Sequence, residues 1–241
     1  MTNQNKLTRV LPEAEAKPAY VNEMFARIAG HYDQLNSLMT LGQDRQWRRE
    51  ALALTDLPFN GSLLDVGTGT GKIAKTAHQI YPAARICASD FTWEMVQAGH
   101  SAAGTRNVYF SIGDTFRLPF DDNEFDAVIS GFMMRNVVDR RAAFLEQRRV
   151  TKPGGRVVCL ETSPPHVVAL GPLFRLYFFT VVPILGGLLA GDVRAYSYLP
   201  ASTVDFPTPA DLARVMELAG LRNVIYRTLM FGSVAIHVGT K

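Results

Sequence analysis

The stretch LLDVGTGTGKIA, residues 63–74, places three glycines at alternate positions between an apolar run and a helical pattern. Glycine lets a ligand approach bare main chain, so this loop predicts a binding site for a polar group. The dinucleotide motif G-x-G-x-x-G does not fit, because its third glycine would fall at Lys72. The phosphate-binding P-loop does not fit either, because no Ser or Thr follows Lys72. What does fit is D-x-G-x-G-x-G, from Asp65 to Gly71, which favours a ligand without phosphate.

Around this loop, short apolar runs alternate with helical patterns from about residue 60 onward, and KPGG (152–155) predicts a turn before one of these runs. Two helical stretches, about 20–31 and 43–54, precede them. Such alternation predicts βαβ units and a parallel sheet with helices on both faces. Near the end of the chain, the runs 223–230 and 232–241 are joined by so little sequence that they can pair only as an antiparallel hairpin. We therefore expect a doubly wound α/β fold with a mostly parallel, seven-stranded sheet and a C-terminal antiparallel hairpin.

The composition indicates one domain with a flexible lead-in. The 241 residues fit a single domain, with a lead-in over 1–18, helices over the site within 19–60 and an apolar insert at 163–205. The net charge of +3 is modest, and the cluster of Arg45, Arg48 and Arg49 is interpreted as a solvated helix face rather than a nucleic-acid patch. Only two cysteines occur, both in apolar runs typical of buried strands, which suits a reducing cytoplasm.

Aspartates close three successive predicted strands, at Asp65, Asp90 and Asp114. Parallel strands end at the same edge of a sheet, where such folds bind ligands, so we expect these carboxylates to meet there. S-adenosylmethionine suits this edge, because it is a sulfonium that carries an amino acid and an adenosine and has no phosphate. Asp90 would bind the ribose hydroxyls, and Asp114 would lie near the adenine amine. The alternative is that all three are ordinary loop aspartates. The five histidines show no metal-ligand spacing, so no metal is expected.

Three longer stretches carry a family resemblance: YDQLNSLMTLGQDRQWRR (32–49), MRNVVDRRAAFLEQRRVTKPGGRVVCLETSPP (134–165) and GDVRAYSYLPAST (191–203). With the glycine loop, they make the chain resemble the UbiE/COQ5 family of S-adenosylmethionine-dependent C-methyltransferases of quinone biosynthesis. The resemblance implies a class I, Rossmann-like methyltransferase that methylates a polyprenylated quinol. Demethylmenaquinol is favoured and a benzoquinol of the ubiquinone pathway stays open. Two alternatives are a methyltransferase on another lipid-like molecule and a non-catalytic binding module.

The resemblance also implies roles for individual residues. It places Tyr32, Arg135 and Asn136 around the quinol ring. It places six further residues around the cofactor: Asp65, Gly67, Gly69, Asp90, Asp114 and Thr115. The permanently charged Arg135 can stabilise a quinolate oxygen, and Asn136 can bond a quinol hydroxyl, although the pair could also only cap its own loop. The sequence departs from the family at Lys72, expected to be a solvated first-turn residue, at Thr115, and at Met133 and Met134.

The segment 167–191 is almost wholly apolar and about long enough to span a bilayer of about 30 Å. It also contains Arg175, two prolines and a Gly-Gly pair, so we interpret it as a lid or a membrane-facing helix, with an ordinary core helix as the alternative. We expect a cytoplasmic protein that associates peripherally with the membrane to reach its prenylated substrate. No nucleic acid is expected as a partner, and a homodimer stays open.

Overall fold

The computed structural model describes residues 12, 15–28, 32–102, 104–164, 180, 198, 202–203 and 206–241. Its α-helices are α2 (Lys17–Ile28), α3 (Tyr32–Met39), α4 (Gln43–Ala53), α5 (Lys72–Ile80), α6 (Trp93–Ser101), α7 (Arg140–Val150) and α11 (Pro209–Leu218). Its strands are β1 (Ser62–Val66), β2 (Arg85–Asp90), β3 (Val108–Ile112), β4 (Phe125–Gly131), β5 (Thr151–Thr162), β6 (Arg222–Leu229) and β7 (Val234–Thr240). The described residues also form two 3-10 turns, η1 (Met134–Asn136) and η3 (Met230–Gly232).

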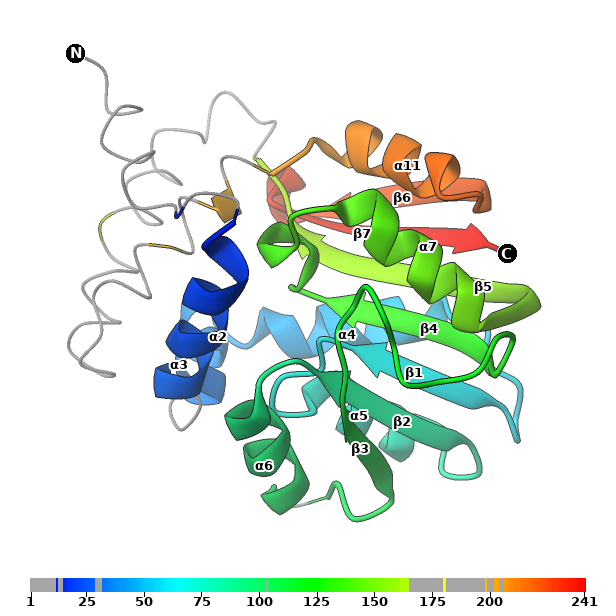
Figure 1. Cartoon of the computed structure of the whole chain (residues 1–241), viewed down its shortest axis with the longest axis horizontal. Helices are drawn as coiled ribbons and strands as arrows, with labels where there is room; N and C mark the ends of the chain where they lie inside the picture. The colour runs from blue at the N-terminus through cyan, green and yellow to red at the C-terminus, as the bar shows by residue number, and fades with distance from the viewer. Residues whose placement is uncertain are drawn as a thin grey trace.

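The strands form one seven-stranded sheet in the order β3-β2-β1-β4-β5-β7-β6 (Figure 1). β1 pairs in parallel with β2 and β4, and the parallel pairing extends to β3 and β5. β7 pairs antiparallel with β5 and β6. The predicted doubly wound fold and its C-terminal antiparallel hairpin are therefore confirmed.

Helices cover both faces of the sheet (Figure 1). Leu63 packs in one buried cluster with Trp47 of α4 and Ile73 of α5. Its neighbour Leu64 packs in a second cluster with Phe144 of α7 and with residues of α11. Consecutive residues of β1 thus enter opposite layers, as the period of two along a strand requires.

The parallel strands end at one edge of the sheet, and α2 and α3 lie beside that edge (Figure 1). This arrangement brings the ends of β1, β2 and β4 together with the N-terminal helices. The edge is therefore the place where the loops of the predicted site meet.

Local details differ from the sequence prediction in two places. The motif KPGG at 152–155 was expected as a turn, but β5 already begins at Thr151, and its pairing with β4 shifts register before Arg156. Gly154 adopts φ 80°, so glycine allows this irregularity inside the strand. A separate helix, α3, also lies between the two N-terminal helices that the sequence predicted.

The predicted lid at 167–191 lies outside the described residues, apart from Thr180. Most of the predicted lead-in at 1–18 lies outside them as well, and α2 begins at Lys17. None of the described helices is long and apolar enough to cross a membrane.

Candidate functional site

The glycine loop joins the carboxyl end of β1 to α5. Gly67, Gly69 and Gly71 have φ angles of 66°, 58° and 78°, in the left-handed region that favours glycine. The amide of Gly67 donates to the carbonyl oxygen of Ser89 at 2.8 Å, which ties the loop to β2. A Cβ at Gly67 would lie 2.5 Å from Cγ of Met133, so this position leaves no room for a side chain. The loop therefore presents main chain to its surroundings.

Asp65 lies under this loop and is fully buried. Its Oδ2 accepts hydrogen bonds from the Thr68 hydroxyl at 2.6 Å and from the Ala74 amide at 3.1 Å. These bonds tie β1 to the loop and to the first turn of α5. Burial raises the pKa of Asp65 from 3.8 to about 7, although the two hydrogen bonds act to lower it. Asp65 therefore braces the loop from behind.

Asp90 closes β2 and contacts the same loop. Its Oδ2 accepts from the Gly69 amide at 2.7 Å, and its Oδ1 accepts from the Thr92 amide at 2.9 Å. Burial raises the pKa of this carboxyl. A carboxylate oxygen can accept more than one hydrogen bond, so Asp90 can still accept from ligand hydroxyls.

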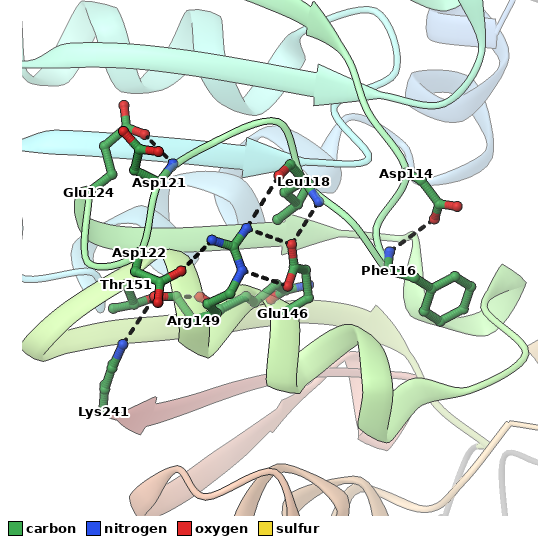
Figure 2. Close-up of polar contacts among 11 residues, drawn as sticks. Asp114, Phe116, Leu118, Asp121, Asp122, Glu124, Glu146, Arg149, Thr151 and Lys241 are labelled. Atoms are coloured by element: carbon green, nitrogen blue, oxygen red, sulfur yellow. Dashed lines mark hydrogen bonds and ion pairs between the residues drawn. The ribbon is translucent and has the colours of Figure 1, made fainter.

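Asp114 and Thr115 follow β3. The carboxylate of Asp114 accepts from the Phe116 amide at 2.9 Å, which makes a tight turn (Figure 2). The Thr115 hydroxyl oxygen is buried and has no hydrogen-bond partner within the part of the chain that the structure describes. A buried hydroxyl without a partner is costly, which favours a bound ligand at this point.

A cavity of about 400 Å³ joins these elements. It is lined by Gly67, Gly69, Asp90, Asp114 and Thr115 on one side and by Met133, Asn136 and Val138 beyond β4. Helix α2 closes it with Pro18, Val21, Asn22 and Phe25. Its volume falls within the range of about 300–1,000 Å³ usual for ligand pockets.

Three polar side-chain atoms in this cavity wall are buried without a partner among the described residues: Oδ1 of Asn22, Oγ1 of Thr115 and Oδ1 of Asn136. Because buried polar atoms normally find hydrogen bonds, these three mark where ligand groups would bind. The donors and acceptors present, together with the main chain of the glycine loop, suit the amino acid, ribose and adenine of S-adenosylmethionine. The cavity thus fits the expected cofactor and leaves Asn136 beside it.

Arg135 lies in η1 but is not among the described residues that line the cavity. Its guanidinium forms an ion pair with Glu161 of β5, and its amide donates to the same carboxylate at 3.2 Å. Arg135 is 5% exposed and Glu161 is 1% exposed. Sequence reasoning missed Glu161, whose one visible signal is an acidic residue near the end of a buried strand.

Tyr32 is the first residue of α3, and its side chain lies outside what the structure describes. The next residue, Asp33, accepts from the Thr70 hydroxyl at 2.7 Å. The Nζ of Lys72 donates to the carbonyl oxygen of Asp33 at 2.9 Å and to the Ser37 hydroxyl at 3.3 Å. Lys72 was expected to be a solvated first-turn residue, and this expectation is wrong in part: it begins α5 but is half-buried and holds α3 on the loop.

The expected solvated face of α4 is also wrong for one residue. Arg45 and Arg49 are exposed, but Arg48 is buried and forms an ion pair with Asp44 one turn earlier. Arg48 lines a second cavity of about 40 Å³ under the glycine loop, together with Asp65 and Lys72. Its neighbour Trp47 occupies the core, so the helix turns this arginine inward.

Within the described ranges, no group of His, Cys, Asp and Glu side chains could hold a metal ion. Both cysteines are buried and free, in β2 and β5, as the sequence indicated.

The profile of the ubiE/COQ5 methyltransferase family matches residues 13–241. A demethylmenaquinone methyltransferase from Roseiflexus castenholzii is 44% identical and covers 97% of this chain and 98% of its own length. A ubiquinone/menaquinone biosynthesis C-methyltransferase UbiE from Desulfotalea psychrophila is 41% identical, with 92% and 90% coverage. A SAM-dependent methyltransferase structure from Thermotoga maritima has a TM-score of 0.65 at 18% identity, with 91% and 99% coverage, which speaks for the fold alone.

Proposed function

This chain belongs to the ubiE/COQ5 methyltransferase family, and from that premise we propose that it methylates a ring carbon of a polyprenylated quinol, with S-adenosylmethionine as the methyl donor. The names of its relatives support demethylmenaquinol as the acceptor and menaquinol as the product. The observation that carries the proposal is the cavity of about 400 Å³, where Asp90 and Asp114 meet three buried polar atoms without partners among the described residues, on Asn22, Thr115 and Asn136.

The cofactor half of the cavity is assigned to residues of β1, β2 and β3. Asp90 accepts from the ribose hydroxyls, Asp114 and Thr115 face the adenine, and Gly67 and Gly69 allow main chain to approach the amino-acid end. When bound, the cofactor would supply a methyl group to the quinol: the new carbon–carbon bond would form as the methyl–sulfur bond breaks, S-adenosylhomocysteine would leave, and the ring proton would pass to water. The protein contributes orientation of the two reactants and control of charge.

The acceptor half is assigned to Asn136, Arg135 and Tyr32. Asn136 bonds a quinol hydroxyl with its buried amide, whose oxygen has no partner among the described residues. Arg135 is not among the described residues that line the cavity, so the positive charge that it is proposed to set against a quinolate oxygen would act from behind the cavity wall; a guanidinium stays protonated there. Glu161 holds that guanidinium in place. Tyr32 is proposed to contact the ring from the start of α3.

We further propose that the protein works in the cytoplasm and associates peripherally with the membrane. The prenyl tail of the substrate would stay in the bilayer, so the enzyme must meet it at the surface. The apolar segment 167–191 is the proposed contact. Flotation with anionic liposomes, with and without Phe174→Ser and Phe178→Ser, tests this point; an unaltered chain that does not float would contradict it.

The function itself is tested with a mixed pool of acceptors. The purified chain is offered labelled S-adenosylmethionine with demethylmenaquinol and a prenylated benzoquinol, and the products are identified by mass spectrometry. Menaquinol is expected as the main product. Methyl transfer to sterols or fatty acyl chains alone would favour a different lipid methyltransferase, and no turnover on any acceptor would favour a binding module.

A further inference from the structure

The turn at 114–118, which carries Asp114 and Thr115, is held from outside the cavity by helix α7 (Figure 2). Oε1 of Glu146 accepts a hydrogen bond from the Leu118 amide at 2.7 Å. The Nη2 of Arg149 donates to the carbonyl oxygen of Leu118 at 3.2 Å. The two polar main-chain groups of one loop residue are thus bound by two side chains one turn apart on α7. We call this arrangement of Glu146, Arg149 and the main chain of Leu118 the Leu118 clamp.

The two side chains of the Leu118 clamp also fix each other. The Nε and Nη2 of Arg149 donate to the two carboxylate oxygens of Glu146 at 2.8 and 2.7 Å, which is a bidentate pair. The hydrogen bond from Arg149 lowers the pKa of Glu146, so its carboxylate stays charged at neutral pH. Such a pair limits the rotamers of both side chains and gives the Leu118 peptide a fixed partner.

Arg149 reaches the far end of the same loop as well (Figure 2). Its Nη1 donates to Asp122 at 2.6 Å, and its carbonyl oxygen accepts from the Asn123 amide at 3.0 Å. Lys241, the last residue, donates to Asn123 at 2.7 Å and to the same carbonyl oxygen at 3.1 Å. The loop from β3 to β4 is therefore attached to α7 at two points.

Between Leu118 and Asp114 the chain is too short and too well bonded to absorb a shift. The Arg117 amide donates to the carbonyl oxygen of Asp114 at 2.9 Å, and the Phe116 amide donates to its carboxylate at 2.9 Å. The side chain of Leu118 is 3% exposed and lies in the apolar cluster under α7. A movement of Leu118 would therefore move Asp114 and Thr115 relative to the cavity.

We propose that Glu146 and Arg149 are positioning residues for the adenine end of the cofactor. Neither side chain lines the cavity; both act through the main chain of Leu118. The proposal rests on the proposed function, since it takes Asp114 and Thr115 as the adenine-side residues.

The test compares Glu146→Ala and Arg149→Lys with Asp122→Asn. Glu146→Ala removes the acceptor of the Leu118 amide, and Arg149→Lys keeps a charge but loses the fork that contacts Glu146 and Leu118 together. Asp122→Asn is the matched control, because it weakens only the outer contact of Arg149. Calorimetry with S-adenosylhomocysteine should show affinity about tenfold weaker for Glu146→Ala, in line with the loss of one partly buried hydrogen bond to a charged group. Arg149→Lys should show a smaller loss, and Asp122→Asn none.

Kinetics separate positioning from a merely structural role. In Glu146→Ala the KM for the cofactor should rise with the dissociation constant, while kcat and the KM for the quinol stay within about twofold. Amide exchange of the turn at 114–118 should become faster in the ligand-free variant. Unchanged affinity in a folded variant with faster exchange would overturn the proposal. So would equal losses in both KM values, kcat and melting temperature.

Failure of the proposed function has a different signature. If the unaltered chain does not bind S-adenosylhomocysteine, the cofactor assignment fails. If exchange of the turn then also stays the same in Glu146→Ala, the Leu118 clamp fails independently of the cofactor.

Discussion

In the half of the cavity assigned to the cofactor, Asp90 and Asp114 stand at and just beyond the ends of β2 and β3, and Asp65 is buried behind the glycine loop. In the half assigned to the acceptor, Arg135 and Asn136 belong to a short 3-10 turn. Each of these aspartates accepts a hydrogen bond from a main-chain amide: Asp65 from Ala74, Asp90 from Gly69 of the glycine loop, and Asp114 from Phe116. The 3-10 turn is tied to Glu161, which comes 26 residues after Arg135. Substitution of Asp90 or Asp114 should therefore act mainly on ligand binding, while substitution of Arg135 should also lower the free energy of unfolding.

Removal of Arg135 gives the largest expected effect. Arg135→Ala would leave Glu161 as a buried carboxylate without its cation, so we expect the free energy of unfolding to fall by about 3 to 5 kcal/mol. Urea denaturation followed by circular dichroism measures this loss. A loss below about 1 kcal/mol, as for an exposed ion pair, would mean that Glu161 does not depend on Arg135.

A double variant separates stability from chemistry in the same pair. Adding Glu161→Gln to Arg135→Ala removes the unpaired charge and should restore part of the stability. Turnover should stay low, because the positive charge proposed to oppose the quinolate is still missing. Recovery of turnover together with stability would place Arg135 among purely structural residues.

Asp65 provides a pH test of the cofactor half. Its pKa is raised from 3.8 to about 7 by burial, so between these values the folded state holds a proton that the unfolded state releases. The contribution of Asp65 to the free energy of unfolding is therefore fully present at low pH and is lost as the pH rises through about 7. Asp65 thus changes the free energy of unfolding by at most about 1.4 kcal/mol per pH unit, between about pH 4 and 7. Asp65→Asn should remove that slope, and parallel stability profiles for the two proteins would contradict it.

The sequence predicted the positions of the three aspartates more completely than the surroundings of Arg135, for a physical reason. Strand polarity alone brings Asp65, Asp90 and Asp114 to one edge, so their positions follow once the strands are recognised. Glu161 lies inside an apolar strand pattern, and nothing local indicates that it pairs with Arg135. Such long-range pairs depend on how separate segments fold onto each other.

The sequence prediction also misplaced or missed single side chains on helices. Arg48 occurs in a run of charged residues that indicates a solvated face, yet Trp47 and the core turn it inward. Asn22 is a polar residue on α2 between apolar positions, and only the cavity shows that it lies on the covered side with Val21 and Phe25. Gly154 shows the same limit for turns, because a KPGG motif can form an irregular strand.

Asp90 offers a local change of intermediate size. Asp90→Ala should weaken S-adenosylhomocysteine binding by about 1.5 to 3 kcal/mol, because charge-assisted hydrogen bonds to the ribose would be lost. The same change frees the Gly69 amide, so part of the loss comes from the loop. Calorimetry measures the affinity, with the exposed Asp121→Ala as a control. Unchanged affinity would refute the ribose assignment.

The smallest effect is expected at Asn22. This effect shows whether α2 contacts the cofactor or the quinol. The Oδ1 of Asn22 is buried in the cavity wall without a partner among the described residues, and a ligand hydroxyl is the natural donor. Asn22→Ala should cost about 0.5 to 1.5 kcal/mol, the usual worth of one neutral hydrogen bond, as a rise in one Michaelis constant. We expect that rise for the quinol, with Glu23→Ala, an exposed neighbour on the same helix, as the matched control. A rise confined to the cofactor, matched by weaker binding of S-adenosylhomocysteine, would instead assign the amide to the ribose and make α2 part of the cofactor half.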